Sequence, residues 1–124
     1  MINLMVMEYF IFSNKNSYDG NFLDGKPYGN GEVNFPNGNT YVGKFRYGNI
    51  TGYGKITFSN GDKYEGELYN GKINGYGRLI LKDNDIFEGG WSNETLTLLN
   101  DKKIICEFID DKTNTAFINN FKDK

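Results

Sequence analysis

The chain is short, nearly neutral and rich in glycine and aromatic residues. Its 124 residues carry a net charge of −2, with 16 glycines, 10 phenylalanines and 9 tyrosines. This length predicts a single domain. The near balance of charge argues against any general attraction to nucleic acid or anionic lipid, so we expect no nucleic-acid partner.

Residues 1–17 are predicted to form an N-terminal capping strand, equivalent to half of a repeat. The run is apolar, but no Lys or Arg precedes it, Glu8 interrupts it and no small-residue cleavage site follows. A signal peptide is therefore the less favoured interpretation, and the run is too short for a transmembrane helix. Phe10 and Phe12 have the spacing of a strand face, which predicts a strand over residues 8–12.

The middle of the chain repeats itself every 23 residues. Counting the opening aromatic residue as position 0, glycine recurs at positions 2, 7, 11 and 13, and a large apolar residue at positions 4, 15 and 17. A fixed period of this length predicts stacked supersecondary units. The copies are 18–40, 41–63 and 64–86, with a partial copy at 87–91, and they open at Tyr18, Tyr41, Tyr64 and Phe87.

Within one copy the apolar residues have the period of a strand, which is two. In the second copy this predicts a strand from Tyr41 and a second strand ending near Phe58, joined by a wider loop over residues 48–52. Asn60-Gly61 predicts a tight hairpin turn before the next copy. Glycine normally weakens a strand interior, so we interpret the recurring mid-strand glycines as sites where aromatic rings lie flat across the backbone.

The second copy, YVGKF followed by GYGKITFSNGDKYEG, resembles the MORN repeat. That pattern is roughly Tyr-x-Gly-x-Trp/Phe, a glycine-rich loop, Gly-x-Gly and a closing aromatic residue. The resemblance covers residues 18–91, although position 4 is Phe or Leu in the full copies and Asn84 replaces a turn glycine in the third. It implies an all-β fold, an elongated single-layer antiparallel sheet of hairpins twisted into a ribbon with a groove. It also implies a non-catalytic role in protein association or membrane attachment.

The repeat pattern stops after Trp91, and residues 92–124 are predicted to form a C-terminal cap. Thr95–Leu99 and Lys103–Ile109 are β-prone runs around a turn, and Ala116–Phe121 is a third apolar patch. Because the last unit of a repeat array must shield its exposed face, capping strands are the first interpretation. A short helix near Thr115–Phe121 is the second.

The residues needed for catalysis are largely missing. The chain has no histidine and a single cysteine, Cys106, so it cannot form a Cys/His nucleophile pair or a zinc cluster. We therefore expect no enzyme activity, no metal, no cofactor and no small-molecule substrate. One unpaired cysteine is typical of a reducing compartment and favours the cytoplasm.

The aromatic face of the predicted sheet is the candidate binding site. Eight strands spaced about 4.8 Å apart form a ribbon roughly 35 Å long, and a single sheet needs a second layer to bury its apolar face. Residues 92–124 are too few to cover all of it, so two interpretations stay open: a core alone, or a core with an open groove that binds a partner. The predicted groove residues are Tyr18, Phe22, Phe35, Tyr41, Phe45, Phe58, Tyr64, Leu68, Phe87 and Trp91.

The favoured function is therefore a scaffold module that binds a protein segment through this groove, or a second copy of the chain through an unpaired strand edge. The alternative is attachment to a phospholipid surface, peripheral to a membrane. Its candidate residues are Lys44, Arg46 and Lys55 on the outer face of the second repeat. Neighbouring Asp and Glu residues lower the net positive charge around these three residues. Lipid attachment generally uses clusters of about four to eight basic residues.

Overall fold

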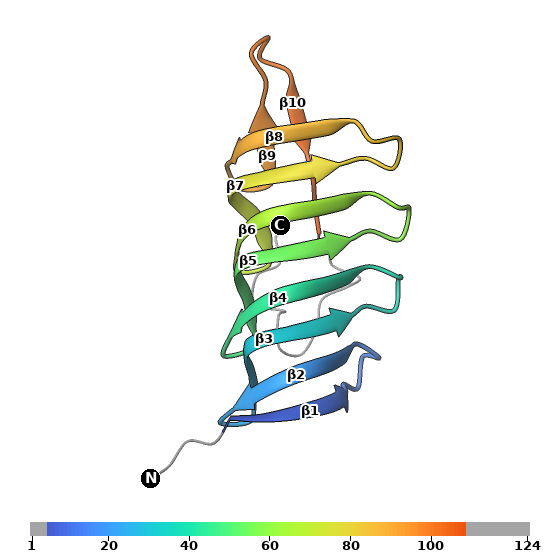
Figure 1. The fold of residues 1–124 in the computed structure, drawn as a ribbon, viewed down its shortest axis with the longest axis vertical. Helices are drawn as coiled ribbons and strands as arrows, with labels where there is room; N and C mark the ends of the chain where they lie inside the picture. The colour runs from blue at the N-terminus through green and yellow to red at the C-terminus, as the bar shows by residue number, and fades with distance from the viewer. Residues whose placement is uncertain (1–4, 109–124) are drawn as a thin grey trace.

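Ten β-strands make up the fold in the computed structural model, which describes residues 5–108. Eight of them form one antiparallel sheet in which every strand pairs with its neighbours in sequence (Figure 1). The last two form a small separate sheet. The predicted all-β, single-layer sheet of hairpins is confirmed. The strands are β1 (Met5–Ile11), β2 (Ser17–Leu23), β3 (Lys26–Asn34), β4 (Thr40–Arg46), β5 (Asn49–Thr57), β6 (Lys63–Tyr69), β7 (Lys72–Ile80), β8 (Ile86–Trp91), β9 (Thr95–Thr97) and β10 (Lys103–Ile105).

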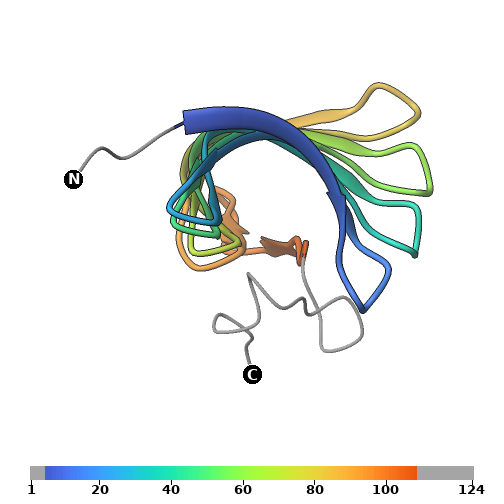
Figure 2. The same ribbon diagram turned by 90° about the horizontal axis from the view of Figure 1, so that it is seen from below.

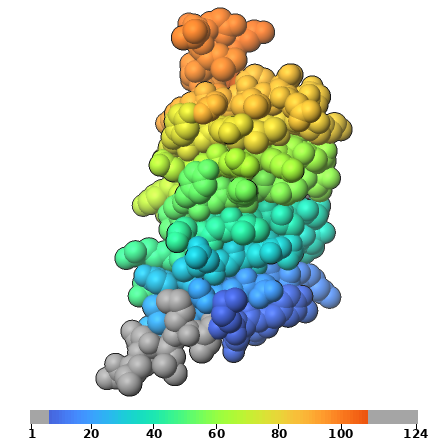
Figure 3. Space-filling view, in the orientation of Figure 1, coloured from blue at the N-terminus to red at the C-terminus, as the bar shows by residue number. Residues whose placement is uncertain are grey.

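The large sheet is curved into an arch, which is clearest when it is viewed end-on (Figure 2). Its inner face carries the core, and the segment containing β9 and β10 lies beneath the arch. In the space-filling view the hairpins form successive bands along the molecule, with the β9–β10 hairpin projecting past β8 (Figure 3). The curvature therefore separates a buried inner face from an exposed outer face.

Two-residue turns join the strands within each repeat. Both turn residues have positive φ, as in Tyr47 (47°) and Gly48 (86°), which is the backbone of a type I′ turn. The wider loop expected over residues 48–52 is therefore wrong. β5 begins at Asn49, and Gly52 lies inside it with a φ of 98°, at a point where the register against β4 shifts. The glycine that looked like a loop residue instead permits a bulge within a strand.

The Asn-Gly turns between repeats form as predicted. Gly61 has a φ of 101° and donates its amide to the Phe58 carbonyl at 2.9 Å, while the Phe58 amide bonds to the Asp62 carbonyl at 2.8 Å. The Asn60 side chain accepts the Asp62 amide at 2.9 Å, an Asx-type interaction that fixes the turn. In the third repeat Asn84 occupies the glycine position with a φ of 76°, a region that Asn tolerates better than most residues.

The N-terminal strand β1 begins three residues earlier than the strand expected over residues 8–12 and ends at Ile11. It pairs with β2 without any shift in register, and Phe10 lies opposite Tyr18 as Val33 lies opposite Tyr41. Glu8 lies opposite Gly20, at the position where the full repeats have glycine. Within the described chain no earlier tyrosine ring crosses this position, so glycine is not required there.

The C-terminal segment folds back over the inner face. Strands β9 and β10 coincide with the two β-prone runs of the sequence and pair with each other. Leu96, Cys106 and Phe108 are buried in the same cluster as the repeat core. The apolar patch Ala116–Phe121, and the alternative of a helix near Thr115–Phe121, lie outside the described residues.

Candidate functional site

The inner face is built around three tyrosine rings that lie across pairs of glycines. In the second repeat, a Cβ atom built on Gly54 would lie 2.4 Å from Cε1 and 2.6 Å from Oη of Tyr41. The same relation recurs at Gly31 with Tyr18 and at Gly77 with Tyr64. Any side chain at these positions would collide with the ring, because carbon atoms normally keep a separation of about 3.5–4.0 Å. The predicted steric role of the mid-strand glycines is confirmed for the tyrosines.

Each of these tyrosines is also fixed by its hydroxyl group. Tyr18, Tyr41 and Tyr64 donate to the carbonyl oxygen three residues later, at 2.6, 2.9 and 2.8 Å. Burial raises the pKa of the Tyr18 hydroxyl to about 12, and burial also raises the pKa values of the other two above their ordinary range. The hydroxyls are therefore protonated donors at neutral pH, and they act structurally.

The residues at position 4 of each repeat pack between these tyrosines. The ring of Phe45 contacts Tyr41 of its own repeat and Tyr18 of the preceding one edge-on, with centroids 5.3 and 5.0 Å apart. At the C-terminal end of the sheet, Trp91 contacts Tyr64 edge-on and donates its indole N–H to the Gly77 carbonyl at 3.1 Å. Such edge-to-face pairs contribute about 0.5–1.5 kcal/mol each beyond the area they bury. The aromatic rings thus link neighbouring repeats along the arch.

One aromatic side chain from outside the repeats inserts into this array. Phe108 is 2% exposed, and its ring lies edge-on to Phe35, with centroids 5.3 Å apart. Its ring also lies 6.1 Å from Tyr41 and 6.4 Å from Phe58. Phe35 and Phe58 are the closing aromatic residues of the first and second repeats. We call the site formed by Phe35, Tyr41 and Phe58 the Phe108 pocket.

Backbone hydrogen bonds help to hold the segment that carries Phe108. The Cys106 amide donates to the Glu94 carbonyl at 2.9 Å, and the β9–β10 hairpin closes through Leu98 and Lys102 at 2.8 Å. Burial raises the pKa of the Cys106 thiol to about 12, so the thiol is protonated and unreactive at neutral pH. Backbone hydrogen bonds and the packing of Leu96, Cys106 and Phe108 therefore both hold the segment on the inner face.

The predicted groove residues all lie on this inner face, but they are not an open surface. Eight of the ten are between 0 and 8% exposed, and Phe58 and Phe87 are partly buried against the same cluster. The open groove expected from the sequence is thus not seen around these rings. Sequence reasoning missed Phe108, because it lies outside the repeat and no periodic signal marks it. The proposed role of the ten residues in partner binding stays a prediction.

The candidate lipid-contacting residues lie on the outer face. Lys44, Arg46 and Lys55 are all exposed. The Lys55 ammonium lies 3.9 Å from the Glu65 carboxylate on the neighbouring strand, and Glu65 in turn lies opposite Arg78. This alternation of charge lowers the positive potential that an anionic lipid surface would meet.

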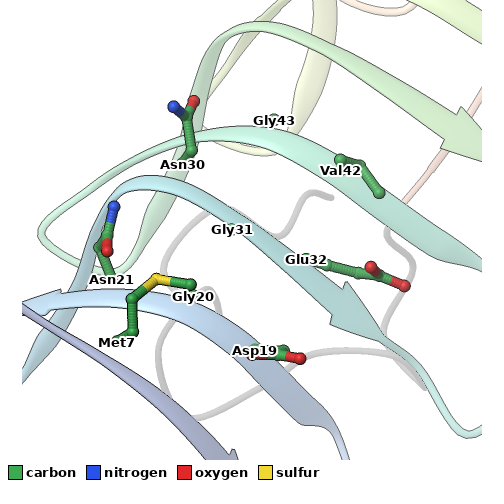
Figure 4. Close-up of a pocket in the computed structure, with 9 residues that line it drawn as sticks. All are labelled: Met7, Asp19, Gly20, Asn21, Asn30, Gly31, Glu32, Val42 and Gly43. Atoms are coloured by element: carbon green, nitrogen blue, oxygen red, sulfur yellow. The ribbon is translucent and has the colours of Figure 1, made fainter.

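A shallow cavity of about 450 Å³ lies on the outer face over β1 to β4 (Figure 4). Asp19 and Glu32 face each other directly across β2 and β3 at its rim, and Met7 and Val42 supply its apolar side. These two carboxylates lie side by side and make this end of the outer face locally acidic. Like charges directly opposite each other also destabilise a strand pair. The remaining lining residues are Gly20, Gly31 and Gly43 together with Asn21 and Asn30.

The residues suited to other chemistry are sparse in the part of the chain that the structure describes. Between residues 5 and 108 there is no group of three or more His, Cys, Asp or Glu side chains that could hold a metal ion. Within the same range no helix has the length and apolar character to cross a bilayer.

The architecture is that of a repeat protein built from β-hairpins, in which each unit supplies a tyrosine, its glycine pair and a closing apolar residue. A family model for the MORN repeat matches residues 18–40, 41–63 and 64–86, which together make up more than half of the chain. The chain therefore belongs to the MORN repeat family, and the predicted repeat boundaries agree with that match. MORN repeats are generally associated with interactions with proteins or membranes. A search of curated proteins found no match.

Proposed function

We propose that this protein is a non-catalytic interaction module whose inner face binds an extended segment of a partner protein. The partner segment places an aromatic side chain in the Phe108 pocket, displacing Phe108. The observation that supports this proposal is that the chain's own Phe108, three residues after the short strand β10, already packs there. The inner face thus accommodates an aromatic side chain from outside the repeats in a defined geometry.

The segment now packed on the inner face is suited to exchange. β9 and β10 have three residues each, and two-stranded hairpins are marginal on their own. Leu96, Cys106 and Phe108 pack on the repeat core, but neither β9 nor β10 is a strand of the large sheet, so the segment can open locally while that sheet stays intact. By contrast, the Phe35, Tyr41 and Phe58 rings are fixed by the repeat strands and lose little entropy when they receive a new side chain.

The tethered segment competes with any partner. A short intramolecular connection gives an effective concentration in the millimolar range. A partner must therefore bind the inner face more tightly than the chain's own segment does, and weakening that segment should raise the apparent affinity for a partner. This relation gives a test that does not require the natural partner.

The test uses a fluorescein-labelled peptide with the sequence of residues 102–108, in which serine replaces the cysteine. Its binding to the full-length chain is measured by fluorescence anisotropy. A Phe108→Ala variant should bind the peptide at least roughly tenfold more tightly than the wild type, because the competing side chain is gone. A control peptide with alanine at its last position should bind neither protein. Tyr53→Ala, an exposed outer-face change, should behave as the wild type does.

The proposal is wrong if Phe108→Ala keeps its far-UV circular dichroism and binds neither peptide up to about millimolar concentration, or if it binds both peptides equally well. If Phe108→Ala does not fold, Phe108→Leu supplies the same comparison with less lost volume. Adding Phe35→Ala to the binding-competent variant should then reduce peptide affinity, since Phe35 is the nearest ring to Phe108.

A further inference from the structure

The two ends of the sheet differ. Beyond β8 the chain continues into β9 and β10, and the turn that joins these two strands projects past that end of the sheet (Figures 1 and 3). At the opposite end β1 pairs with β2 on one side, and no other strand of the described chain pairs with it on the other. One edge of β1 therefore presents backbone N–H and C=O groups that no described strand uses.

β1 has one feature that normally protects an edge strand, the charge of Glu8, and lacks the others. It spans seven residues, MVMEYFI, pairs with β2 in unbroken register, and contains no proline, lysine or bulge. Its outer-face side chains Met7, Tyr9 and Ile11 are 71, 62 and 57% exposed, and Phe10 on the inner face is 46% exposed. Natural sheets usually interrupt such an edge with charge, proline or a bulge, because it otherwise pairs with another strand.

We propose that β1 pairs antiparallel with β1 of a second copy of this chain, across a two-fold axis that passes between the two Tyr9 residues. Directly opposed residues in an antiparallel pair lie on the same face. A two-fold pairing that keeps both inner faces on one side must therefore set one residue directly opposite its own copy. The sequence of β1 distinguishes between the candidates.

A pairing centred on Glu8 would set two carboxylates directly opposite each other, which is destabilising. A pairing centred on Phe10 would leave only residues 9–11 overlapping, and one centred on Met7 would overlap residues 5–9 and leave the exposed Ile11 outside the pairing. The pairing centred on Tyr9 opposes Met7 to Ile11 on the outer face and Glu8 to Phe10 on the inner face, with the two tyrosines in contact. It therefore brings together the exposed outer-face side chains Met7, Tyr9 and Ile11 of the two strands without opposing like charges.

A second copy is the occupant that this edge fits best, because the pairing is self-complementary. An isologous two-fold contact uses the same surface on both chains and therefore stops at a dimer. In that dimer the unpaired β1 edges of both chains are paired with each other. The net charge of −2 per chain offers little repulsion to association. This proposal uses a different surface from the inner face and does not depend on the proposed function.

The test is sedimentation equilibrium of the full-length chain, in which the wild type should show a concentration-dependent mass approaching twice that of one chain. Tyr9→Lys places two positive charges on the axis and should raise the dimer dissociation constant at least roughly tenfold, because lysine is a common protector of strand edges. Tyr76→Lys, at a similarly exposed position on β7, is the matched control and should leave the dimer intact.

The register is tested by charge pairs. In the proposed pairing, Met7→Lys with Ile11→Glu places opposite charges across the axis and should still give a dimer. Met7→Lys with Ile11→Lys places like charges there and should give a monomer. A monomeric wild type at about 100 μM, well above the micromolar range in which weak specific contacts form, would overturn the proposal. It would also be overturned if a folded Tyr9→Lys kept the wild-type dissociation constant, or if the two charge-pair variants associated equally.

Discussion

Replacing Gly54 by alanine should destabilise the protein far more than an ordinary glycine-to-alanine change in a strand. The three heavy atoms nearest to the added Cβ would all belong to Tyr41, at 2.4 to 2.7 Å. The Tyr41 ring is 0% exposed, so it has no free volume into which to move. The ring must therefore shift by roughly 1 Å to restore normal contact.

The magnitude follows from the interactions lost. Overpacking a core position costs about 1–3 kcal/mol, and losing the bond from the Tyr41 hydroxyl to the Lys44 carbonyl costs about 1 kcal/mol. Alanine recovers about 0.5–1 kcal/mol relative to glycine by reducing the entropy of the unfolded chain. The free energy of unfolding should fall by about 2–3 kcal/mol, measured by urea unfolding with the fluorescence of Trp91, the single tryptophan.

A control and a double-mutant cycle isolate the cause. At Gly90 a Cβ would have no neighbour within 4 Å, so Gly90→Ala should change stability by less than about 0.5 kcal/mol. In a Tyr41→Ala background, which itself costs about 3–5 kcal/mol, Gly54→Ala should cost almost nothing further. A coupling free energy near about 2 kcal/mol is expected. If Gly54→Ala costs the same with and without the Tyr41 ring, the steric account of the glycine pairs is wrong.

Three further outcomes are expected. Tyr64→Phe should lower the free energy of unfolding by about 1 kcal/mol, because it leaves the Glu67 carbonyl without its donor; an unchanged urea midpoint would contradict this role. Because burial raises the folded-state pKa values of Cys106 and Tyr18 to about 12, above their unfolded values near 9 and 10, their contribution to stability is complete below pH 9 and should be lost as pH rises toward 12. Urea midpoints across this range check the direction, and Cys106→Ala should move the onset of the loss upward by about one pH unit. The wild type should not sediment with vesicles containing phosphatidylserine, even at low salt, since the outer-face lysines alternate with carboxylates; sedimentation that salt abolishes would favour the lipid alternative.

Much of the fold could be predicted because the repeat aligns with itself. A strand period of two, a unit length of 23 residues and Asn-Gly turns are enough to order the strands of an antiparallel sheet. The steric role of the glycines also followed from their mid-strand positions. The turn at Tyr47-Gly48 was misplaced because Gly52 has positive φ, and a glycine in that conformation fits a bulge as well as a loop.

The part of the site that could not be predicted is the part formed by residues outside the repeat. Phe108 reaches the inner face through a contact between segments about 50 to 70 residues apart in sequence, and no local pattern specifies such a contact. The length of the sheet, compared with the few residues after Trp91, suggested an open groove. In the structure the Phe108 ring packs between the closing aromatic residues of the first and second repeats. For β1 the sequence showed only an apolar N-terminal run interrupted by Glu8, which did not indicate that one edge of the strand is unpaired in the described chain.

The most direct test of the account is whether Phe108 packs on the inner face in solution. Proton NMR on the full-length chain should show nuclear Overhauser effects between the Phe108 ring and the rings of Phe35 and Phe58, whose centroids lie 5.3 and 6.4 Å away. Addition of saturating peptide to Phe108→Ala should produce the same contacts between molecules. Ring resonances of Phe108 at random-coil positions, with no contact to either ring, would contradict the account.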